Sequence, residues 1–303
     1  MKRKIFSLVL IVAFAIPCLF GLSGCKKTPP TVESWDGTIA EVSAAQDDII
    51  MIDTAEELAG FAKSVNDGDS YEGITVKLAC DMDMKNLEWT PIGYGRARDL
   101  NKDSERDLDE GRAFDGIFDG QNKTIKNLNV VGKYTDANDS REVVDDGSSC
   151  GVGLFGLVFG SIKNLKIDTA VVSGNHYVGA LVGYISNFSA SETYAGSIEN
   201  CHVTNATIHC TYKNSDNGGD KAGALVGYLD QTSISNCSVK NCSVDAVRDA
   251  GQMIGGVAHT DVTNFAEIAE TNTATNVTVV CNIDEPTGNQ GSNIREDELV
   301  GRV

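Results

Sequence analysis

A six-letter phrase, GALVGY, occurs twice in this chain and constrains its fold more than any other feature. The first copy begins at residue 179 and the second at residue 223, which places them 44 residues apart. Self-similarity at a distance of this size is the sequence signature of proteins built from stacked, similar units. Each such unit buries its apolar face only against its neighbours, so a chain of repeats is expected to form one continuous core.

Aligning the chain on this phrase and on the segment that follows it predicts five units. Each unit has a glycine-rich half and then a half that follows the pattern Ile-x-Asn-x-x-Val, which is weakest in the fifth unit. The glycine-rich halves lie at 116–120, 153–156, 179–183, 223–227 and 251–255, and the asparagines are Asn127, Asn164, Asn200, Asn236 and Asn276. These asparagines are spaced 37, 36, 36 and 40 residues apart, whereas the loops between the halves vary in length. Constant strands with variable loops are typical of a stack, because a loop leaves one face without disturbing its neighbours.

The asparagine-containing pattern is short, β-branched and partly alternating, which predicts a strand. A further short apolar stretch follows it in several units, as at Val171, Ile208 and Val244. Three strands per unit, with Gly and Asn at the turns, predict an all-β fold: a right-handed parallel β-solenoid of about five to seven coils, with neighbouring strands about 4.8 Å apart. We interpret the repeated asparagines as one structural ladder at a corner, bonded to the backbone or to the next asparagine.

Cysteines are frequent, but their spacing matches no metal-binding pattern. Seven lie beyond the first 25 residues: Cys80, Cys150, Cys201, Cys210, Cys237, Cys242 and Cys281. We interpret them as small buried apolar residues. Cys201 and Cys237 occupy the same position in successive units, a position that Leu128, Leu165 and Val277 hold elsewhere in the alignment. A disulfide between these two cysteines in an exported protein is left open, as is any other pairing.

A helix over 53–66 is expected to cap the N-terminal end of the stack, because an open end would expose strand edges. Thr54 followed by Glu57 forms a capping box at its start. The apolar residues that follow at helical spacing, and so share one face, are Leu58, Phe61, Ala62 and Val65. The segment 293–302 is expected to close the last coil at the other end.

The first 24 residues have the organisation of a signal peptide, with a basic start and an apolar run that continues to Gly21. The sequence Leu-Ser-Gly-Cys then ends at Cys25, which predicts a bacterial lipoprotein with Cys25 as the lipidated residue and the first of the mature chain. Acyl chains on Cys25 would anchor the protein to a membrane. An uncleaved membrane-spanning anchor is the alternative. We expect a flexible tether over 25–48 and a single domain over 49–303.

The charge of the chain argues against a nucleic-acid partner. Asp and Glu outnumber Lys and Arg by 43 to 25, and the formal net charge is −18. Removing residues 1–24 removes three positive charges and makes the mature chain still more acidic. Such a surface repels polyanions, including nucleic acids and anionic polysaccharides.

Catalytic and cofactor signatures are scarce, and we expect no cofactor and no metal site. The four histidines, His176, His202, His209 and His259, fall in no zinc-protease pattern and are interpreted as isolated exposed side chains. The glycine-rich stretch at 151–156 belongs to the repeat and not to a phosphate-binding loop. Two acidic clusters are candidate calcium ligands but lack the EF-hand spacing: Asp99, Asp103, Glu105, Asp107, Asp109 and Glu110, with Asp216 and Asp220.

The units resemble the GLUG repeat of bacterial surface and adhesin-like proteins, a repeat also found in non-catalytic regions of some secreted IgA-cleaving metallopeptidases. The resemblance rests on "GALVGY" with the following Ile-x-Asn-Cys-x-Val segment. It extends upstream to "AEELAGFAKSVN", "WTPIG" and "FDGIFDG", and so covers about 50–281. An acidic insertion at 96–112 departs from this pattern. The resemblance implies the fold and export, and it implies no catalytic residue.

Two functions from different classes follow. The first is a lipid-anchored lipoprotein, exposed at the cell surface, that acts as a non-catalytic binding or adhesion module for glycan or protein. The second is a carbohydrate-active β-helix enzyme, either a polysaccharide lyase or a glycosidase. A groove lined by acidic groups, with Arg or Lys across adjacent coils, would favour the enzyme. Binding is expected in the loops whose sequences the stacking of strands does not constrain, at 96–112, 185–197, 211–221 and 256–272.

Overall fold

A computed structural model gives the fold of the chain from residue 32 onward. The structure describes residues 32–94, 112–132, 151–186, 196–211, 221–246, 249–258, 268–281 and 299–302. All of them belong to one compact unit, 31–303. Among these residues, no helix is long and apolar enough to span a membrane.

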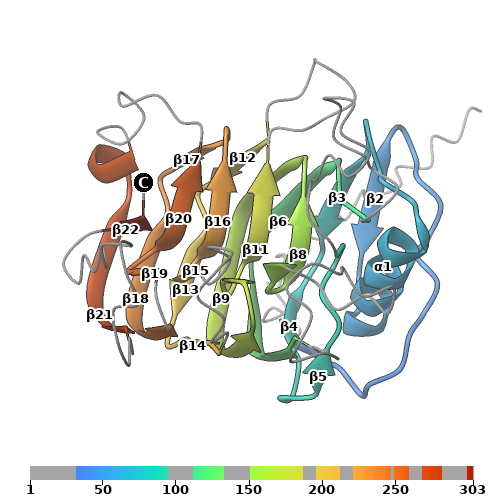
Figure 1. The fold of residues 1–303 in the computed structure, drawn as a ribbon. Helices are drawn as coiled ribbons and strands as arrows, with labels where there is room; N and C mark the ends of the chain where they lie inside the picture. Colours follow the sequence, from blue (N-terminus) through green and yellow to red (C-terminus); the bar gives the residue numbers. More distant parts are fainter. Residues whose placement is uncertain are drawn as a thin grey trace, which may run out of the picture. The chain divides into compact units, whose positions relative to one another are not determined.

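The described residues form three sheets and one long helix, α1, at Ala55–Asp67 (Figure 1). The first and largest sheet contains β1 Val32–Ser34, β2 Ile49–Ile52, β3 Thr75–Leu78, β4 Asp81–Asp83, β5 Glu88–Trp89, β6 Ile117–Val131, β9 Ser161–Gly174, β12 Ser197–Glu199, β13 His202–Thr204, β14 Thr207–Cys210, β17 Ser233–Ser235, β18 Ser238–Ala246 and β21 Thr273–Cys281. The second contains β7 Gly151–Val152, β10 Tyr177–Val178, β15 Lys221–Gly223 and β19 Asp249–Gly251. The third contains β8 Phe155–Val158, β11 Val182–Ser186, β16 Val226–Asp230, β20 Ile254–Ala258 and β22 Val300–Arg302. A short helical segment lies at 268–271.

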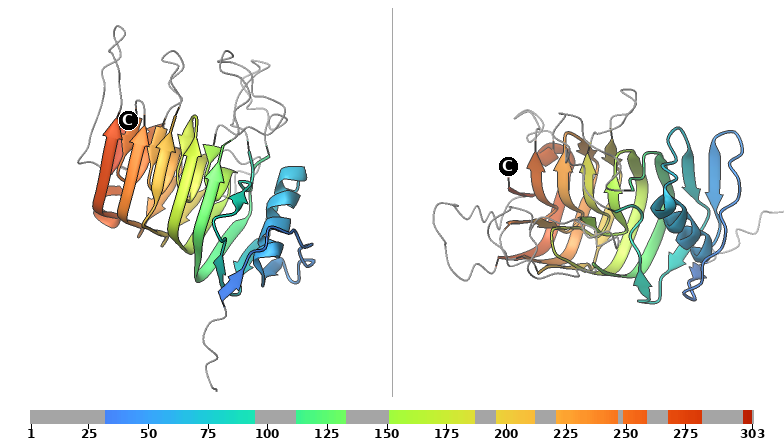
Figure 2. Two further views of the ribbon diagram at one scale, coloured as in Figure 1. Left: turned by 90° about the horizontal axis from the view of Figure 1, so that it is seen from below. Right: turned by 45° about the vertical axis from the view of Figure 1, so that its right-hand side comes forward.

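Successive repeats contribute successive parallel strands to the three sheets, as the progression of colours in Figure 2 shows. Val182 of β11 lies beside Phe155 of β8 on one side and beside Val226 of β16 on the other. Tyr184 and Tyr228, the last residues of the two GALVGY copies, are likewise in register. The prediction of an all-β fold with parallel strands is therefore confirmed.

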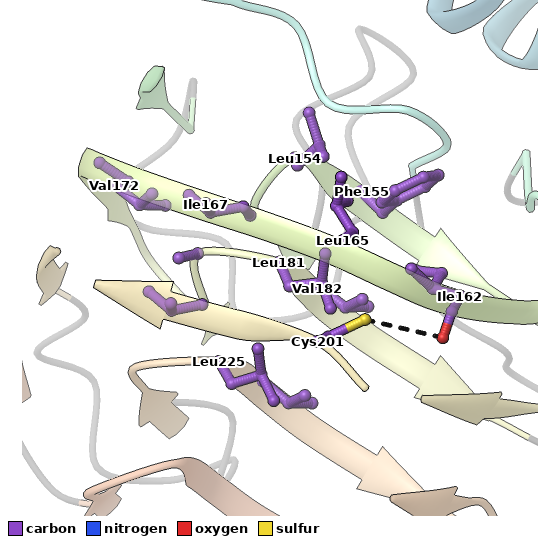
Figure 3. Packing of buried hydrophobic residues seen from close by; sticks show 14 of the residues in the cluster. Leu154, Phe155, Ile162, Leu165, Ile167, Val172, Leu181, Val182, Cys201 and Leu225 are labelled. Atoms are coloured by element: carbon purple, nitrogen blue, oxygen red, sulfur yellow. Dashed lines mark hydrogen bonds between the residues drawn. The ribbon is translucent and has the colours of Figure 1, made fainter. Parts of the chain in front are cut away.

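The core lies between the first sheet and the other two, and it consists of rows of identical or similar side chains. Ile162, Ile198 and Ile234 are in register in three successive repeats, and each is at most 2% exposed. Figure 3 shows residues of β9, among them Leu165, with Leu181 from the glycine-rich half in the same cluster. Each such aliphatic side chain contributes about 1.5–3 kcal/mol when it is fully buried, so the repeated pattern supplies the main stabilising term.

The second glycine of GALVGY is required by a close approach between the second and third sheets. A Cβ atom on Gly183 would lie 2.1 Å from the backbone nitrogen of Val152. A Cβ atom on Gly227 would lie 2.4 Å from the backbone nitrogen of Val178. Because these neighbours are backbone atoms of the adjoining repeat, only glycine allows the two sheets to approach this closely.

The repeated asparagines form two corner rows, and the expected single ladder is wrong. In the first corner row, Asn164, Asn200 and Asn236 follow in-register residues of β9, β12 and β17. The second corner row contains Asn127, Thr169, Asn205, Asn241 and Asn276. All eight residues have φ between 52° and 59°, in the left-handed region that asparagine tolerates better than most residues.

The misalignment arises because each repeat carries the same local pattern twice, five residues apart. Asn200 is followed by Asn205 in one repeat, and Asn236 by Asn241 in the next. Asn276 pairs with Asn241, so the asparagine half of the fifth unit lies one strand away from its predicted place. The glycine-rich half of that unit pairs with 223–227 as predicted. The first unit was also misplaced, because residues 117–119 pair with 161–163 in the first sheet and do not form a glycine-rich half.

Hydrogen bonds between repeats support the structural interpretation of these asparagines. Asn200 Nδ2 donates to Asn164 Oδ1 at 2.8 Å in the first corner row. Asn276 Nδ2 donates to Asn241 Oδ1 at 2.8 Å in the second. The side chains therefore satisfy one another across neighbouring repeats at the turns.

Much of the segment expected to be a tether packs on the domain. In β1, Val32 pairs with Asp81 of β4. Trp35 is 8% exposed, and its ring lies 5.5 Å from that of Trp89. The backbone N–H of Ala40 then donates to the carbonyl oxygen of Glu56 in α1. The predicted tether over 25–48 therefore needs correction, because a strand pairing, the packing of Trp35 on Trp89 and a hydrogen bond to α1 hold residues 32–40 to the fold.

Helix α1 begins where a helix over 53–66 was expected. Thr54 Oγ1 accepts a hydrogen bond from the backbone N–H of Glu57 at 3.1 Å. The Glu57 carboxylate in turn accepts from the backbone N–H of Asp53, one residue earlier than in the usual capping box. The helix lies at the N-terminal end of the strands and contributes the expected apolar face to the core (Figure 2). At the other end, β22 pairs with β20, while residues 293–298 lie outside the described part.

Candidate functional site

A group of aromatic and charged side chains lies on the outer side of the second and third sheets. Val178 and Ala222 belong to the core, so the residues just before them in β10 and β15 point the other way. The same alternation applies in β11 and β16, where Ile185 and Leu229 are core residues. We name this group the tyrosine–charge cluster; it consists of Tyr177, Tyr184, Tyr228, Lys221, Asp230 and Asp249.

Three tyrosine rings pack on one another in this cluster. The rings of Tyr177 and Tyr228 are stacked, with centroids 5.0 Å apart and planes inclined by 15°. Tyr184 lies 5.3 Å from Tyr177 and 5.5 Å from Tyr228. Leu157 is in register with Tyr184 and extends this apolar surface. Tyr184 is only 5% exposed, whereas Tyr177 and Tyr228 are partly exposed.

A buried ion pair borders the rings. Lys221 Nζ lies 3.0 Å from Asp249 Oδ2, and the two side chains are 7% and 5% exposed. The ammonium group also lies 5.5 Å from the centroid of the Tyr228 ring, within the range of a cation–π interaction. Gly256 stands in register with Tyr228, and a Cβ atom there would lie 2.4 Å from Lys221 Cδ. The absence of a side chain at Gly256 therefore makes room for the methylene groups of Lys221.

A second buried carboxylate accepts hydroxyl groups. Asp230 is 2% exposed. Tyr184 Oη donates to Asp230 Oδ2 at 3.1 Å, and Ser186 Oγ donates to the same oxygen at 3.3 Å. Aromatic faces beside fixed polar groups are the usual composition of glycan-binding and protein-binding surfaces, because rings supply contact area and polar groups supply orientation.

The cluster lies at the bases of the predicted binding loops. Ser186 is the last described residue before 187–195, and Lys221 is the first after 212–220. The central parts of the four predicted loops lie outside the described residues, as do Cys25, Cys150 and His259. The acidic residues weighed as calcium ligands fall there too. Among the described side chains, no group of three or more His, Cys, Asp or Glu residues could hold a metal ion.

The described histidines have partners, so the expectation of isolated side chains is wrong for them. His176 packs beside Tyr177, with ring centroids 6.3 Å apart. His209 Nδ1 lies 3.6 Å from Asp245 Oδ2 in the neighbouring repeat, where both side chains are partly exposed. His202 lies on the outward side of β13, in register with Ser238 of β18.

The cysteines behave as apolar core residues. Cys201, Cys210, Cys237 and Cys242 are buried, and Cys80 and Cys281 are partly buried. Cys201 and Cys237 are neighbours across two repeats, as predicted, and the backbone N–H of Cys201 lies 3.4 Å from the Cys237 sulfur atom. Burial raises the pKa of the Cys201 thiol well above its ordinary value, which suppresses the reactive thiolate.

The tyrosine–charge cluster was missed by reasoning from the sequence, although one signal for it was present. Tyr177, Lys221 and Asp249 each stand two residues before a glycine of the repeat. Aligning that position across repeats would have placed an aromatic ring, a cation and an anion side by side. The partners of Asp230 had no such signal, because they depend on side-chain reach across strands.

Comparison with known proteins agrees with the repeat. The model of the GLUG motif matches residues 174–208 and 219–245, which contain both copies of GALVGY. These two stretches of the chain are therefore similar to the GLUG motif. It is also similar to halomucin from Haloquadratum walsbyi (strain DSM 16790 / HBSQ001), with 26% identity over 184 residues. That alignment covers 55% of this chain but 2% of halomucin, so the chain spans a very small part of that relative.

One solved structure is similar over most of its length. It is a Bacteroides ovatus protein described as a "putative immunoglobulin A1 protease", with 16% sequence identity and a TM-score of 0.43. The match covers 85% of this chain and 84% of that one. At this identity and TM-score, the likeness supports no conclusion about fold or activity.

Proposed function

We propose that this chain is an exported, lipid-anchored surface protein whose repeats form a right-handed parallel β-solenoid and present a binding surface for glycan or protein. The basic and apolar N-terminus ending in Cys25 supports the anchor. The GLUG motif and the similarity to part of halomucin support a place at the cell surface. The strand register supports the solenoid, because every repeat adds neighbouring strands to the same three sheets.

The tyrosine–charge cluster is the observation that carries the binding role. It combines partly exposed rings of Tyr177 and Tyr228 with a buried carboxylate and a buried ion pair. The stacked rings are already ordered by mutual contact, so a ligand that packs on them loses little conformational entropy. Sugar rings and aromatic or aliphatic side chains of a protein both fit such a surface.

The burial and mutual pairing of the charged groups favour binding over polysaccharide cleavage. A lyase or glycosidase needs an acid or a base that can reach the substrate. Lys221 and Asp249 are of the right types and lie in adjacent repeats, but they are buried and hold each other at 3.0 Å. This ion pair therefore stabilises the surface that carries it and does not meet the geometric requirement of the enzyme.

The test is a glycan and protein binding array with the chain from residue 26 onward, followed by affinity measurement for any ligand found. Tyr177→Ala removes a stacked ring and should weaken binding at least about tenfold, which corresponds to about 1.4 kcal/mol. Thr207→Ala, on the outward side of the first sheet, is the matched control and should leave the affinity unchanged. A ligand whose affinity is indifferent to Tyr177→Ala would contradict the assignment of this surface.

A further inference from the structure

Three polar side chains on the outward side of the first sheet form a connected chain that the binding role does not use. Ser238 Oγ lies 2.8 Å from His202 Nδ1, and His202 Nε2 lies 3.1 Å from Asn200 Oδ1. All three residues are partly exposed, so small molecules can reach them. Ser238 and His202 face each other because β13 and β18 are in register, while Asn200 belongs to the turn before β13.

The first corner row determines which nitrogen atom of His202 carries the proton. Asn200 Nδ2 donates to Asn164 Oδ1 at 2.8 Å, which orients the Asn200 amide with its oxygen toward His202. An amide oxygen only accepts hydrogen bonds, so His202 Nε2 must be the protonated nitrogen. In the neutral ring Nδ1 then carries the lone pair and accepts the hydroxyl proton of Ser238. The asparagine ladder thus sets the tautomer in which the imidazole acts as a base toward the serine.

The charge state of the His202 ring also suits a base. Partial burial lowers the pKa of His202, and the neighbouring Lys166 ammonium lowers it further. Lys166 is in register with His202 on the side opposite Ser238. At neutral pH the imidazole is therefore predominantly neutral and able to accept a proton.

We propose that Ser238 is an activated nucleophile that takes acyl groups from carboxylic esters, with His202 as its general base and Asn200 as the positioning residue. A hydroxyl group beside a base that a third group orients is the arrangement by which nucleophilic serines and cysteines are activated. Position in the fold, and not a local sequence motif, brings the three together: Ser238 lies 36 residues beyond His202.

The proposed reaction consumes only the ester and water. Ser238 Oγ bonds to the ester carbonyl carbon as its proton passes to His202 Nδ1, and the carbon–oxygen bond to the alcohol breaks. The departing alkoxide takes the proton from Nδ1 and leaves as the alcohol. Water then attacks the acyl-serine with the same base, releasing the acid and restoring Ser238. Because the side chains lie on the outer surface of a sheet, the fitting substrates are esters whose acyl group protrudes from its carrier.

The decisive experiment uses the full mature chain and a fluorophosphonate probe, which reacts much faster with activated hydroxyl groups than with ordinary ones. The Ser238 oxygen would bond to phosphorus while the phosphorus–fluorine bond breaks and fluoride leaves. Intact mass and peptide mapping should then show one phosphonyl group, on Ser238. Hydrolysis of p-nitrophenyl acetate should show a burst equal to the protein concentration.

Matched variants distinguish a Ser238 hydroxyl group that is activated by His202 from one that is only exposed to the probe. Ser238→Ala should abolish labelling, and His202→Gln should slow it at least about 100-fold, in line with the contribution of a general base. Ser243→Ala changes a serine on the same strand that lies beside Thr207 and not beside histidine, and it should label like the unaltered chain. Thermal unfolding of each variant checks that it is folded. Equal labelling rates for His202→Gln and the unaltered chain, or no label on Ser238, would overturn the proposal.

The positioning role of Asn200 can be tested by a measurement that a purely structural contribution of Asn200 would not change. Nitrogen chemical shifts of His202 distinguish a proton on Nε2 from one on Nδ1. The unaltered chain should show the Nε2–H form, and Asn200→Ala should give a mixture of tautomers with slower labelling. A tautomer unchanged by Asn200→Ala would show that the amide does not position the ring.

Discussion

At the scale of single residues, the corner asparagines combine an uncommon backbone conformation with hydrogen bonds between repeats. Asn205 has φ of 56°, and its side chain donates to Asp168 Oδ1 at 2.7 Å. Asn241 donates in turn to Asn205 Oδ1 at 3.4 Å. The residue type is selected because asparagine visits the left-handed region at a lower energetic cost than most other residues.

We expect Asn205→Val to lower the free energy of unfolding by at least about 1–2 kcal/mol, because a β-branched side chain clashes in this conformation. Asn205→Gly loses the same hydrogen bonds without the clash and should cost less. Urea denaturation of both variants measures the two contributions. If the valine and glycine variants were equally stable, conformation would not be what selects asparagine here.

The Asp83 carboxylate predicts a dependence of stability on pH. Burial works to raise its pKa, but the Asn127 side chain, the Lys85 N–H and the charges of Lys126 and Lys85 outweigh burial and hold the pKa below its ordinary value. A carboxyl group with a lowered pKa stabilises the fold above its unfolded pKa of about 3.9, and this stabilisation disappears as pH falls through the folded value.

Asp83→Asn should therefore reduce the loss of stability on going from pH 7 to pH 3. The measurement is urea denaturation at both pH values, with Asp36→Asn as the control. Asp36 also has a lowered pKa, but its hydrogen bonds to Thr38 are local and fully exposed. A pH dependence that survives in Asp83→Asn would assign the effect to other carboxylates.

At the scale of elements, the packing of the second sheet on the third depends on a missing side chain. Gly183 of β11 approaches the backbone of β7 so closely that a methyl group would overlap the nitrogen of Val152, with a separation of 2.1 Å. Backbone atoms in a ladder cannot give way as a flexible side chain can. The repeated glycine is therefore a packing requirement of the sheets, and not a sign of chain flexibility.

Gly183→Ala should destabilise the domain by at least about 3 kcal/mol, the upper range for overpacking. Gly73→Ala is the matched control, because it has φ of 76° and open space around its Cα atom. That variant should cost only about 1 kcal/mol, from backbone strain alone. Thermal and urea unfolding distinguish the two, and equal costs would contradict the close-packing explanation.

At the scale of the whole molecule, successive similar repeats build a continuous core, with α1 at the N-terminal end (Figure 1). The described part of the domain begins at residue 32, seven residues beyond Cys25, the proposed lipidation site.

Cys25→Ala should release the protein from membranes into the soluble fraction, because acyl chains supply the binding energy. Cys18→Ala, within the predicted signal peptide, is the control and should remain with the membrane. Cell fractionation with immunodetection measures both. A Cys25→Ala variant that still sediments with membranes would favour the uncleaved anchor.

Several features of the fold could be predicted because they depend on neighbours in sequence. The alternation of β-branched residues indicates strands, the Thr54–Glu57 spacing indicates the start of α1, and the recurrence of GALVGY indicates stacking. Units two, three and four were aligned correctly, as the register of Ile162, Ile198 and Ile234 shows. Unit one and the asparagine half of unit five are displaced, because the local asparagine pattern occurs at two corners of each repeat, whereas the glycine-rich half of unit five is in the predicted register.

By itself, then, the sequence determined that the chain forms stacked parallel strands with apolar rows inside, since periodicity and residue type suffice for that. Only the tertiary structure decided which outward side chains meet. Lys221 and Asp249 are 28 residues apart, and Ser238 and His202 are 36 apart. Their contacts depend on loop lengths and strand register, and a shift of register by one residue would turn each of them to the opposite face.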